Sequence, residues 1–399
     1  MSKRILFAIG LSMLFLDPAF AADLAAGKSP CGPRMSCLLA GPVNSTLPPL
    51  MSLISDIAPG VCVDDVMGVY KQNDVAICEA FLDNGSGSDR ERAAALVNLG
   101  HAYRMKPGQY QNPVLSLQSW DRAIAADPSF AEPWVLKGDI AFEQHKDDEA
   151  VADYDRALVL DPKHWRALMG KSRAFVRRGQ IPDALALARA AVDAAPDVSI
   201  AHQLLGALIE RQGNLTEALE EYRKATELDH GEYRRLPGIN QEPSPWSVLA
   251  SAEMRLGHVE RAIDAISHEI DGKRVQNVSP DIFMQRGQYL EAAGRFTDAA
   301  DDYEKSLMDF GANFPNADEI RTRIAMLRAK AGDSKTAQAN FHDLLRSGKL
   351  QSILRVQVFL RNNGFNDIEI DGKMSATLEK ALDRCLSQPD CSVAIGQSI

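Results

Sequence analysis

The side chains that could act as acids, bases or nucleophiles are spread along this 399-residue chain without a recognisable catalytic grouping. Three histidines, His101, His202 and His258, could each act as a general base in isolation, but none has a nucleophile or metal ligand close by in the sequence. The patterns GxSxG, HExxH and GxxxxGK[ST] do not occur. We therefore interpret the histidines as helix-surface or packing residues, and the sequence predicts no catalytic residue, cofactor or metal ion.

One acidic stretch invites a calcium interpretation. Asp367, Glu369 and Asp371 alternate ahead of Gly372, as carboxylates do in a calcium-binding loop. The carboxylate that should close such a loop is Glu379, which comes one residue late. On a helix that shift turns the side chain by about 100°, so we predict no calcium site.

Arginines offer a different chemistry, the recognition of anions. Arg173 and Arg177 are four residues apart and share one face of a predicted helix. On a chain with a formal charge of −10, such a pair is a candidate clamp for a carboxylate or phosphate. The alternative is surface charge that pairs with neighbouring carboxylates. The acidic balance also argues against non-specific binding of nucleic acid.

The six cysteines form three pairs that are close in sequence: Cys31 and Cys37, Cys62 and Cys78, Cys385 and Cys391. No CxxC spacing occurs, and no histidine lies near a pair. Local disulfides are therefore the favoured interpretation, with free thiols and a metal site as alternatives. Six cysteines allow 15 connectivities, so the pairing is a prediction.

The N-terminus has the pattern of a secretory signal peptide. Lys3 and Arg4 precede an apolar run over 5–16, and the small residues Ala19 and Ala21 resemble a cleavage site. The run is shorter than the roughly 20 residues that span a bilayer. We expect export, with no integral membrane segment after cleavage at residue 22, and hence conditions that permit disulfides.

The most regular part of the chain is a repeat. Residues 131–232 divide without gaps into three segments of 34 residues. In the first segment, apolar and small residues fall at helical spacing, and a proline ends the second helix. The residues that mark this pattern are Trp134, Gly138, Ala150, Tyr154, Ala157 and Pro162.

This pattern resembles the tetratricopeptide repeat (TPR) family residue for residue. The resemblance implies an all-α fold, a right-handed superhelix of helical hairpins, with about seven repeats over 93–347. It further implies that a protein or peptide binds in a concave groove lined by the first helix of each hairpin. Carried over, the groove positions include Arg104, Phe142, Arg166, Met169, Arg173, Arg177 and Arg211. The family's chaperone-binding members use a lysine-and-asparagine clamp. Ser172 and Arg173 stand where asparagine is expected, so a chaperone partner is not supported.

The last segment, 348–399, resembles the small three-helix peptidoglycan-binding domain. The residues that carry the resemblance are Gly364, Phe365, Asp371, Gly372 and Thr377. The family usually has an aromatic residue and a glutamine near the end of the last helix, where this chain has Arg384 and Cys385. The resemblance implies the three-helix fold and contact with the cell wall, and the residues at 384 and 385 depart from the family's pattern.

Together these features predict a signal peptide (1–22), a flexible leader (23–60), capping helices (61–92), the TPR array (93–347) and the peptidoglycan-binding-like domain (348–399). The function that fits them is a non-enzymatic scaffold in a bacterial periplasm, which binds a protein or peptide and contacts the wall. One alternative is a soluble interaction module whose C-terminal domain has no affinity for glycan. Another is a wall-processing enzyme with a site assembled in space.

Overall fold

The computed structural model describes residues 74–85, 87–105, 112–229, 243–271, 278–308, 317–388 and 391. These residues form seventeen α-helices, and no strand occurs among them. The predicted signal peptide, the leader and the start of the capping segment lie outside the described residues. Contacts divide the chain into two units, Met1–Glu242 and Pro243–Ile399, which are described separately.

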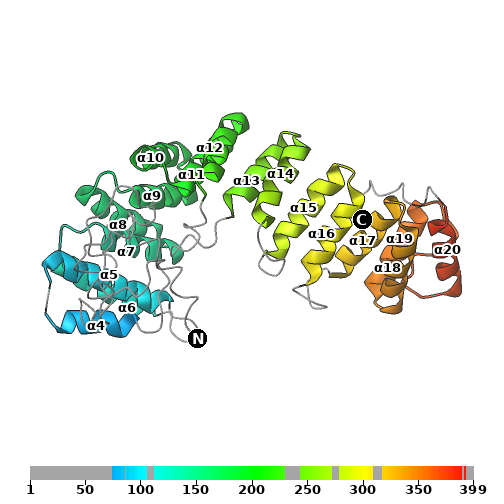
Figure 1. Cartoon of the computed structure of the whole chain (residues 1–399), viewed down its shortest axis with the longest axis horizontal. Helices are drawn as coiled ribbons and strands as arrows, with labels where there is room; N and C mark the ends of the chain where they lie inside the picture. The colour runs from blue at the N-terminus through cyan, green and yellow to red at the C-terminus, as the bar shows by residue number, and fades with distance from the viewer. Residues whose placement is uncertain are drawn as a thin grey trace, which may run out of the picture. The chain divides into compact units, whose positions relative to one another are not determined.

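Within unit 1, helices that are consecutive in sequence pack as antiparallel pairs (Figure 1). A single helix, α4 (Asp74–Asp83), packs on the first pair. The four pairs are α5 (Asp89–Met105) with α6 (Pro113–Ala126), α7 (Glu132–Glu143) with α8 (Asp147–Leu160), α9 (Trp165–Arg177) with α10 (Ile181–Ala194), and α11 (Ser199–Arg211) with α12 (Leu215–Glu227).

A glycine facing an aromatic ring sets the spacing of most of these pairs. A Cβ added to Gly138 would lie 2.7 Å from the ring of Tyr154, and one added to Gly206 would lie 2.7 Å from the ring of Tyr222. Real Cβ atoms do not approach so closely, so the two helices can pack at this distance only with glycine there. Gly138 and Tyr154, two of the residues that mark the repeat in the sequence, thus set the spacing of this pair of helices.

The third pair uses a different solution at the same positions. Ser172 replaces the glycine, and Ala188 stands 34 residues after Tyr154. The Ser172 hydroxyl is fully buried and donates a hydrogen bond to the carbonyl oxygen of Ala184, at 2.7 Å. A small residue on the second helix therefore leaves room for a side chain on the first.

The described turns inside the second, third and fourth hairpins each contain a left-handed residue. Gly179 and Gly213 take φ angles of 75° and 89°, and His145, which occupies the equivalent place in the preceding hairpin, takes φ 60°. Glycine has no Cβ to clash in this region, which explains its use at this position.

Unit 2 repeats the hairpin architecture. Its pairs are α13 (Pro245–Arg255) with α14 (Val259–Ile270), α15 (Pro280–Ala292) with α16 (Phe296–Met308), and α17 (Ala317–Lys330) with α18 (Ser334–Arg346). Two further helices follow, α19 (Leu350–Asn362) and α20 (Ala376–Leu386). Gly287 again faces an aromatic ring, that of Tyr303, although more loosely, at 3.2 Å.

The C-terminal helices α19 and α20 share one hydrophobic core with the last hairpin. This core joins Phe341 and Leu345 of α18 to Phe359 of α19 and Leu382 of α20. The rings of Phe341 and Phe359 stack with their centroids 4.7 Å apart. The predicted separate three-helix domain is not confirmed. The described part of 348–399 holds two helices, and their apolar faces are buried against the array.

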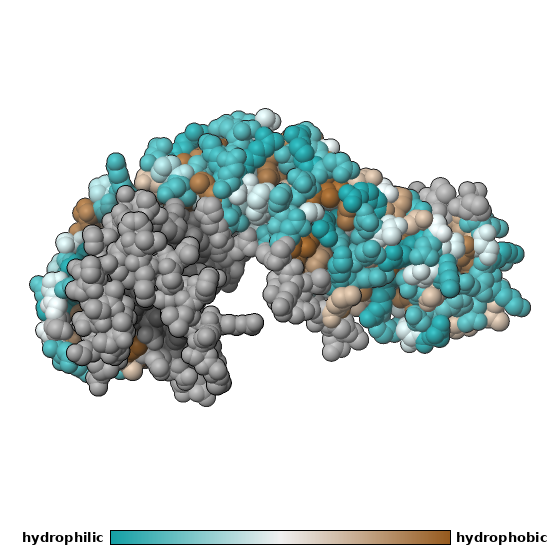
Figure 2. All heavy atoms as spheres, in the orientation of Figure 1, coloured by the Kyte–Doolittle hydropathy of each residue, from teal (hydrophilic) through white to brown (hydrophobic). Residues whose placement is uncertain are grey.

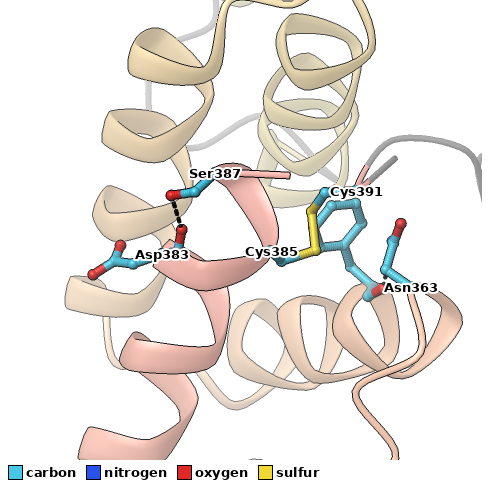
Figure 3. Close-up of a disulfide and its surroundings, with 6 residues drawn as sticks. Asn363, Asp383, Cys385, Ser387 and Cys391 are labelled. Atoms are coloured by element: carbon cyan, nitrogen blue, oxygen red, sulfur yellow. Dashed lines mark hydrogen bonds between the residues drawn. A yellow bond between two sulfur atoms is a disulfide. The ribbon is translucent and has the colours of Figure 1, made fainter. Parts of the chain in front are cut away.

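A disulfide joins Cys385 of α20 to Cys391, as predicted (Figure 3). Both cysteines are buried and belong to the shared core. Cys78 of α4 is also disulfide-bonded. Cys31, Cys37 and Cys62 lie outside the described residues.

Candidate peptide-binding surface

The first helices of the hairpins in unit 1 form one continuous face. Helix α9 contacts both α7 and α11 directly, in addition to its own partner α10. We call the surface of α5, α7, α9 and α11 the first-helix face. The predicted groove residues lie on these four helices: Arg104 on α5, Phe142 on α7, Arg166, Met169, Arg173 and Arg177 on α9, and Arg211 on α11.

Arg166 lies at the contact between α7 and α9, where it is buried. Its guanidinium donates to Glu132 at 2.5 Å and to Asp139 at 2.9 Å. Its side chain is only 7% exposed, and that of Glu132 only 5%. Removal of either side of this contact would leave an uncompensated buried charge, so the stacked hairpins require both the arginine and its carboxylates. Arg166 therefore contributes to the contact between hairpins and not to a free anion clamp.

Two more side chains extend this buried network. The Tyr154 hydroxyl of α8 donates to Asp139 at 2.8 Å, and a ring nitrogen of His164 lies 3.0 Å from the Glu132 carboxylate. Burial raises the pKa of the Tyr154 hydroxyl well above its usual value, and Asp139 raises it further. Burial by itself would raise the pKa of Glu132. The neighbouring Arg166 and His164 have the larger, opposite effect and hold the pKa of Glu132 at about 2. Glu132 is consequently ionised throughout the physiological range.

Phe142 lies at the end of α7, next to two arginines of α9. The guanidinium carbon of Arg177 lies 3.6 Å from the centre of the Phe142 ring, and that of Arg173 lies 5.0 Å from it. Arg177 also donates to the Phe142 carbonyl oxygen at 2.8 Å and forms an ion pair with Asp147. Cation–π contacts of this kind contribute about 0.5–1 kcal/mol at exposed sites. Phe142, Arg173 and Arg177, which we call the Phe142 cluster, thus lie in contact.

The remaining predicted groove residues are not part of the Phe142 cluster. Arg104 pairs with Glu143 of α7, and Met169 is 5% exposed. Arg211 is exposed, and no ion pair joins it to any described residue. Three of these five arginines, Arg104, Arg166 and Arg177, thus pair with carboxylates of the same unit.

Sequence reasoning missed several of these internal partners, including His164 and Asp147. A signal for one pair was present. Glu132 and Arg166 are 34 residues apart, so they occupy the same position in successive repeats and carry opposite charges. Neighbouring first helices lie side by side, so such residues are placed to pair.

The C-terminal motif residues have structural partners. The Gln357 side chain, 2% exposed, donates to the Asp371 carboxylate at 2.9 Å and accepts from the backbone N–H groups of Asp371 and Gly372. Gly364 ends α19 with φ 88°, and the guanidinium of Arg384 lies over the buried ring of Phe365. Thr377 is exposed in the first turn of α20, which Ser375 caps.

Two other kinds of site, metal centres and membrane-spanning helices, do not occur in the described part of the chain. No group of three metal-binding side chains occurs there. None of the described helices is long and apolar enough to cross a membrane.

Comparison with known proteins agrees with the repeat pattern. Residues 115–164 and 169–232 match the tetratricopeptide repeat family model. A curated soybean (Glycine max) relative, Hsp70-Hsp90 organizing protein 1, is 28% identical over 115 residues, which is 29% of this chain and 20% of that protein. A TPR repeat-containing protein of Treponema pallidum is 26% identical over 268 residues, 65% of this chain and 29% of that protein. The chain thus spans less than a third of either relative.

Among solved structures, the fold is similar to that of YrrB, described as a TPR protein with an unusual peptide-binding site. The TM-score is 0.36 at 17% identity, over 48% of this chain and 92% of YrrB.

Proposed function

We propose that this chain, which carries tetratricopeptide repeats, is a non-enzymatic scaffold that binds a protein or peptide on the first-helix face of unit 1. The observation that carries the proposal is the side-by-side packing of α7, α9 and α11, which joins surface from successive hairpins into one area. Repeat arrays use such extended surfaces for recognition. The peptide-binding site named for YrrB agrees with this use of the fold.

The Phe142 cluster is the proposed centre of the contact. An arginine over an aromatic ring offers a flat, partly apolar surface, and arginine and aromatic residues are enriched at protein interfaces. The partner would contact Phe142 and Arg173, with Arg211 to one side. The soybean relative's name concerns Hsp70 and Hsp90, but we propose neither as a partner, because Ser172 is buried and bonded to the backbone of Ala184.

Photocrosslinking in cells tests this proposal. A photoreactive residue at position 173 or 211 should capture a discrete partner that mass spectrometry identifies, and Phe142→Ala should reduce the yield at both positions. A matched probe at Arg189, which is exposed on the second helix α10, should capture little of the same partner. Equal capture from both faces would contradict the proposal.

We further propose that the protein is exported to a bacterial periplasm. The signal-like N-terminus supports this, as do the disulfide between Cys385 and Cys391 and the bonded Cys78, since disulfides persist in oxidising compartments. Cell fractionation with N-terminal sequencing tests it. A protein that stays in the cytoplasm with residues 1–22 intact would contradict it.

The role of 348–399 has two candidates. Contact with peptidoglycan is supported only by the motif resemblance, and the Asp371–Gly372 turn is already held by Gln357. The shared core favours the other candidate, in which α19 and α20 cover the open face of the last hairpin. Co-sedimentation of the full chain with purified sacculi separates them, because only a wall-binding protein is enriched in the pellet. Release of muropeptides in the same assay would instead favour the enzyme alternative.

A further inference from the structure

His202 of α11 is a buried histidine at a place where the two preceding hairpins have apolar residues. It is 4% exposed, and Leu168 and Trp134 stand one and two repeats earlier in the chain. Glu221 of α12 likewise stands where α10 has Leu187. In the third hairpin, Leu168 and Leu187 belong to one hydrophobic cluster. The fourth hairpin thus has an ionisable pair in place of an apolar one.

Both ring nitrogens of His202 face oxygen atoms. Nδ1 lies 2.6 Å from a carboxylate oxygen of Glu221, and Nε2 lies 2.9 Å from the carbonyl oxygen of Pro196. A carbonyl oxygen and an ionised carboxylate accept hydrogen bonds and cannot donate them. A neutral imidazole has a single N–H group and could serve only one of these two acceptors. The two contacts therefore require the imidazolium form, which has an N–H on each nitrogen.

Glu221 is the ionised partner in this arrangement. Burial by itself would raise the pKa of Glu221, but hydrogen bonds from His202 and Lys224 outweigh burial and lower that pKa. The ammonium of Lys224 lies 3.1 Å from the second oxygen of the same carboxylate. Because Glu221 has no proton to donate, the proton between the two side chains belongs to Nδ1 of His202.

Three other histidines that contact carboxylates do not have this constraint. His164, His258 and His342 each face a carboxylate through one ring nitrogen, at 3.0, 2.7 and 2.9 Å. A neutral ring can donate its single N–H to that carboxylate and keep the contact. Loss of a proton from His202, by contrast, must cost one of its two contacts.

The other helices that pack against α11 are α9 and α10, and their charged groups have partners elsewhere. Arg173 belongs to the Phe142 cluster, and Asp193 is exposed at the end of α10. The remaining cations pair with carboxylates of α7, α8 and α12, and they are Arg166, Lys171, Arg177, Arg178 and Arg189. Glu221 and Lys224 are thus the charged groups that act on His202.

We propose that His202 is a pH-sensitive tie between the third and fourth hairpins. Pro196 lies in the turn between α10 and α11, and Glu221 lies on α12. The protonated ring therefore connects the end of the third hairpin to both helices of the fourth. When the proton leaves for solvent, a nitrogen lone pair faces either the carbonyl oxygen or the carboxylate, and that contact is lost. This device is independent of what binds on the first-helix face.

The direction of the pH effect follows from the two contacts. They favour the protonated ring in the folded chain, whereas an unfolded histidine loses its proton near pH 6.5, roughly the ordinary value. The stabilisation is therefore fully present below about pH 6.5 and is lost as the pH rises through the value at which the folded protein releases the proton. The fourth hairpin should loosen in mild alkali and not in mild acid.

NMR of the full chain with isotope-labelled histidine rings tests the protonation state. At about pH 7, both ring nitrogens of His202 should have the chemical shifts of N–H groups. The His202→Gln variant identifies the signal by its absence. A bare nitrogen on His202 at this pH would overturn the proposal.

Hydrogen exchange tests the consequence for the hairpin. Between about pH 6 and pH 9, and after correction for the intrinsic rise of exchange with pH, protection of α11 and α12 should fall about tenfold. Glu221→Gln should abolish this fall, because an amide can donate to a neutral ring as well as accept from a charged one. His202→Leu with Glu221→Leu, which restores the residue types of Leu168 and Leu187, should abolish it too. The proposal also fails if either variant loses protection as steeply as the wild type.

Discussion

Tyr154 determines the distances among three helices. Its ring lies where a Cβ on Gly138 of α7 or on Gly170 of α9 would be, with clearances of 2.7 and 2.4 Å. Its hydroxyl donates a hydrogen bond to the Asp139 carboxylate, which also accepts a hydrogen bond from Arg166. One aromatic residue therefore couples the packing inside a hairpin to the polar contact with the next hairpin.

Gly138→Ala should consequently destabilise unit 1 by about 1–3 kcal/mol, since overpacking outweighs the gain in helix propensity. Gly287→Ala is the matched comparison, because its neighbour is farther away, at 3.2 Å, and the cost should be smaller. Urea unfolding monitored by circular dichroism measures both. Equal stability changes would show that the contact does not set the helix spacing.

Arg166→Leu should cost about 3–5 kcal/mol, because it leaves two carboxylates, Glu132 and Asp139, without their cation. Arg211→Leu removes the same charge from an exposed position of α11 and should stay within about 0.5 kcal/mol of the wild type. Similar losses for the two variants would be inconsistent with a structural role for Arg166.

Ionised Glu132 should make the free energy of unfolding of unit 1 depend on pH in the acidic range. Its folded pKa is about 2, against 4.5 for an unperturbed glutamate. The unfolded state thus takes up the proton more readily. The stabilisation is fully present above pH 4.5 and is lost as the pH falls towards 2. Glu132→Gln should flatten this part of the unfolding profile, and an unchanged slope would assign the acid sensitivity elsewhere.

The sequence predicts the residues that pack between helices better than it predicts the partners of charged side chains, and the reason is physical. The positions of Gly138 and Tyr154 follow from helical periodicity, which one chain segment displays by itself. The partners of Arg104 and Arg177 depend on which carboxylates of another helix come within reach, and a surface arginine has many rotamers. Pairing of the arginines with neighbouring carboxylates was therefore foreseeable as an alternative to an anion clamp, but the partner of each arginine was not.

At the scale of elements, the end of unit 2 differs most from its sequence prediction. The apolar residues of α19 have ordinary helical spacing, which predicts a buried face but does not say against what it packs. In the structure, Phe359 of α19 stacks on Phe341 of α18, across the predicted domain boundary at residue 348. A local motif could be recognised around Gly372, but the shared core could not, because it joins segments that are distant in sequence.

The disulfide between Cys385 and Cys391 should hold α20 onto this core. Replacing both cysteines with serine should reduce stability by about 2 kcal/mol, the value expected for closing a short loop. Hydrogen exchange should accelerate in α19 and α20 while α7 to α9 keep their protection. Faster exchange throughout both units would argue against a local role.

At the scale of the whole molecule, most hairpins contact only the hairpins beside them. Stability in such an array spreads through nearest-neighbour interfaces. Arg166→Leu should therefore raise hydrogen exchange most in α7 to α9, less in α5 and α12, and not at all in α17 to α20. Uniform loss of protection would indicate that the chain unfolds as a single cooperative block.

The placement of α19 and α20 bears on how copies of this protein could assemble. Helical hairpins are self-similar, so a bare last hairpin presents a surface suited to the first hairpin of another molecule, and repetition of that contact would produce open-ended filaments. Phe359 and its neighbours occupy that surface. Stacking of another molecule on this face of the last hairpin would therefore first require α19 and α20 to leave it.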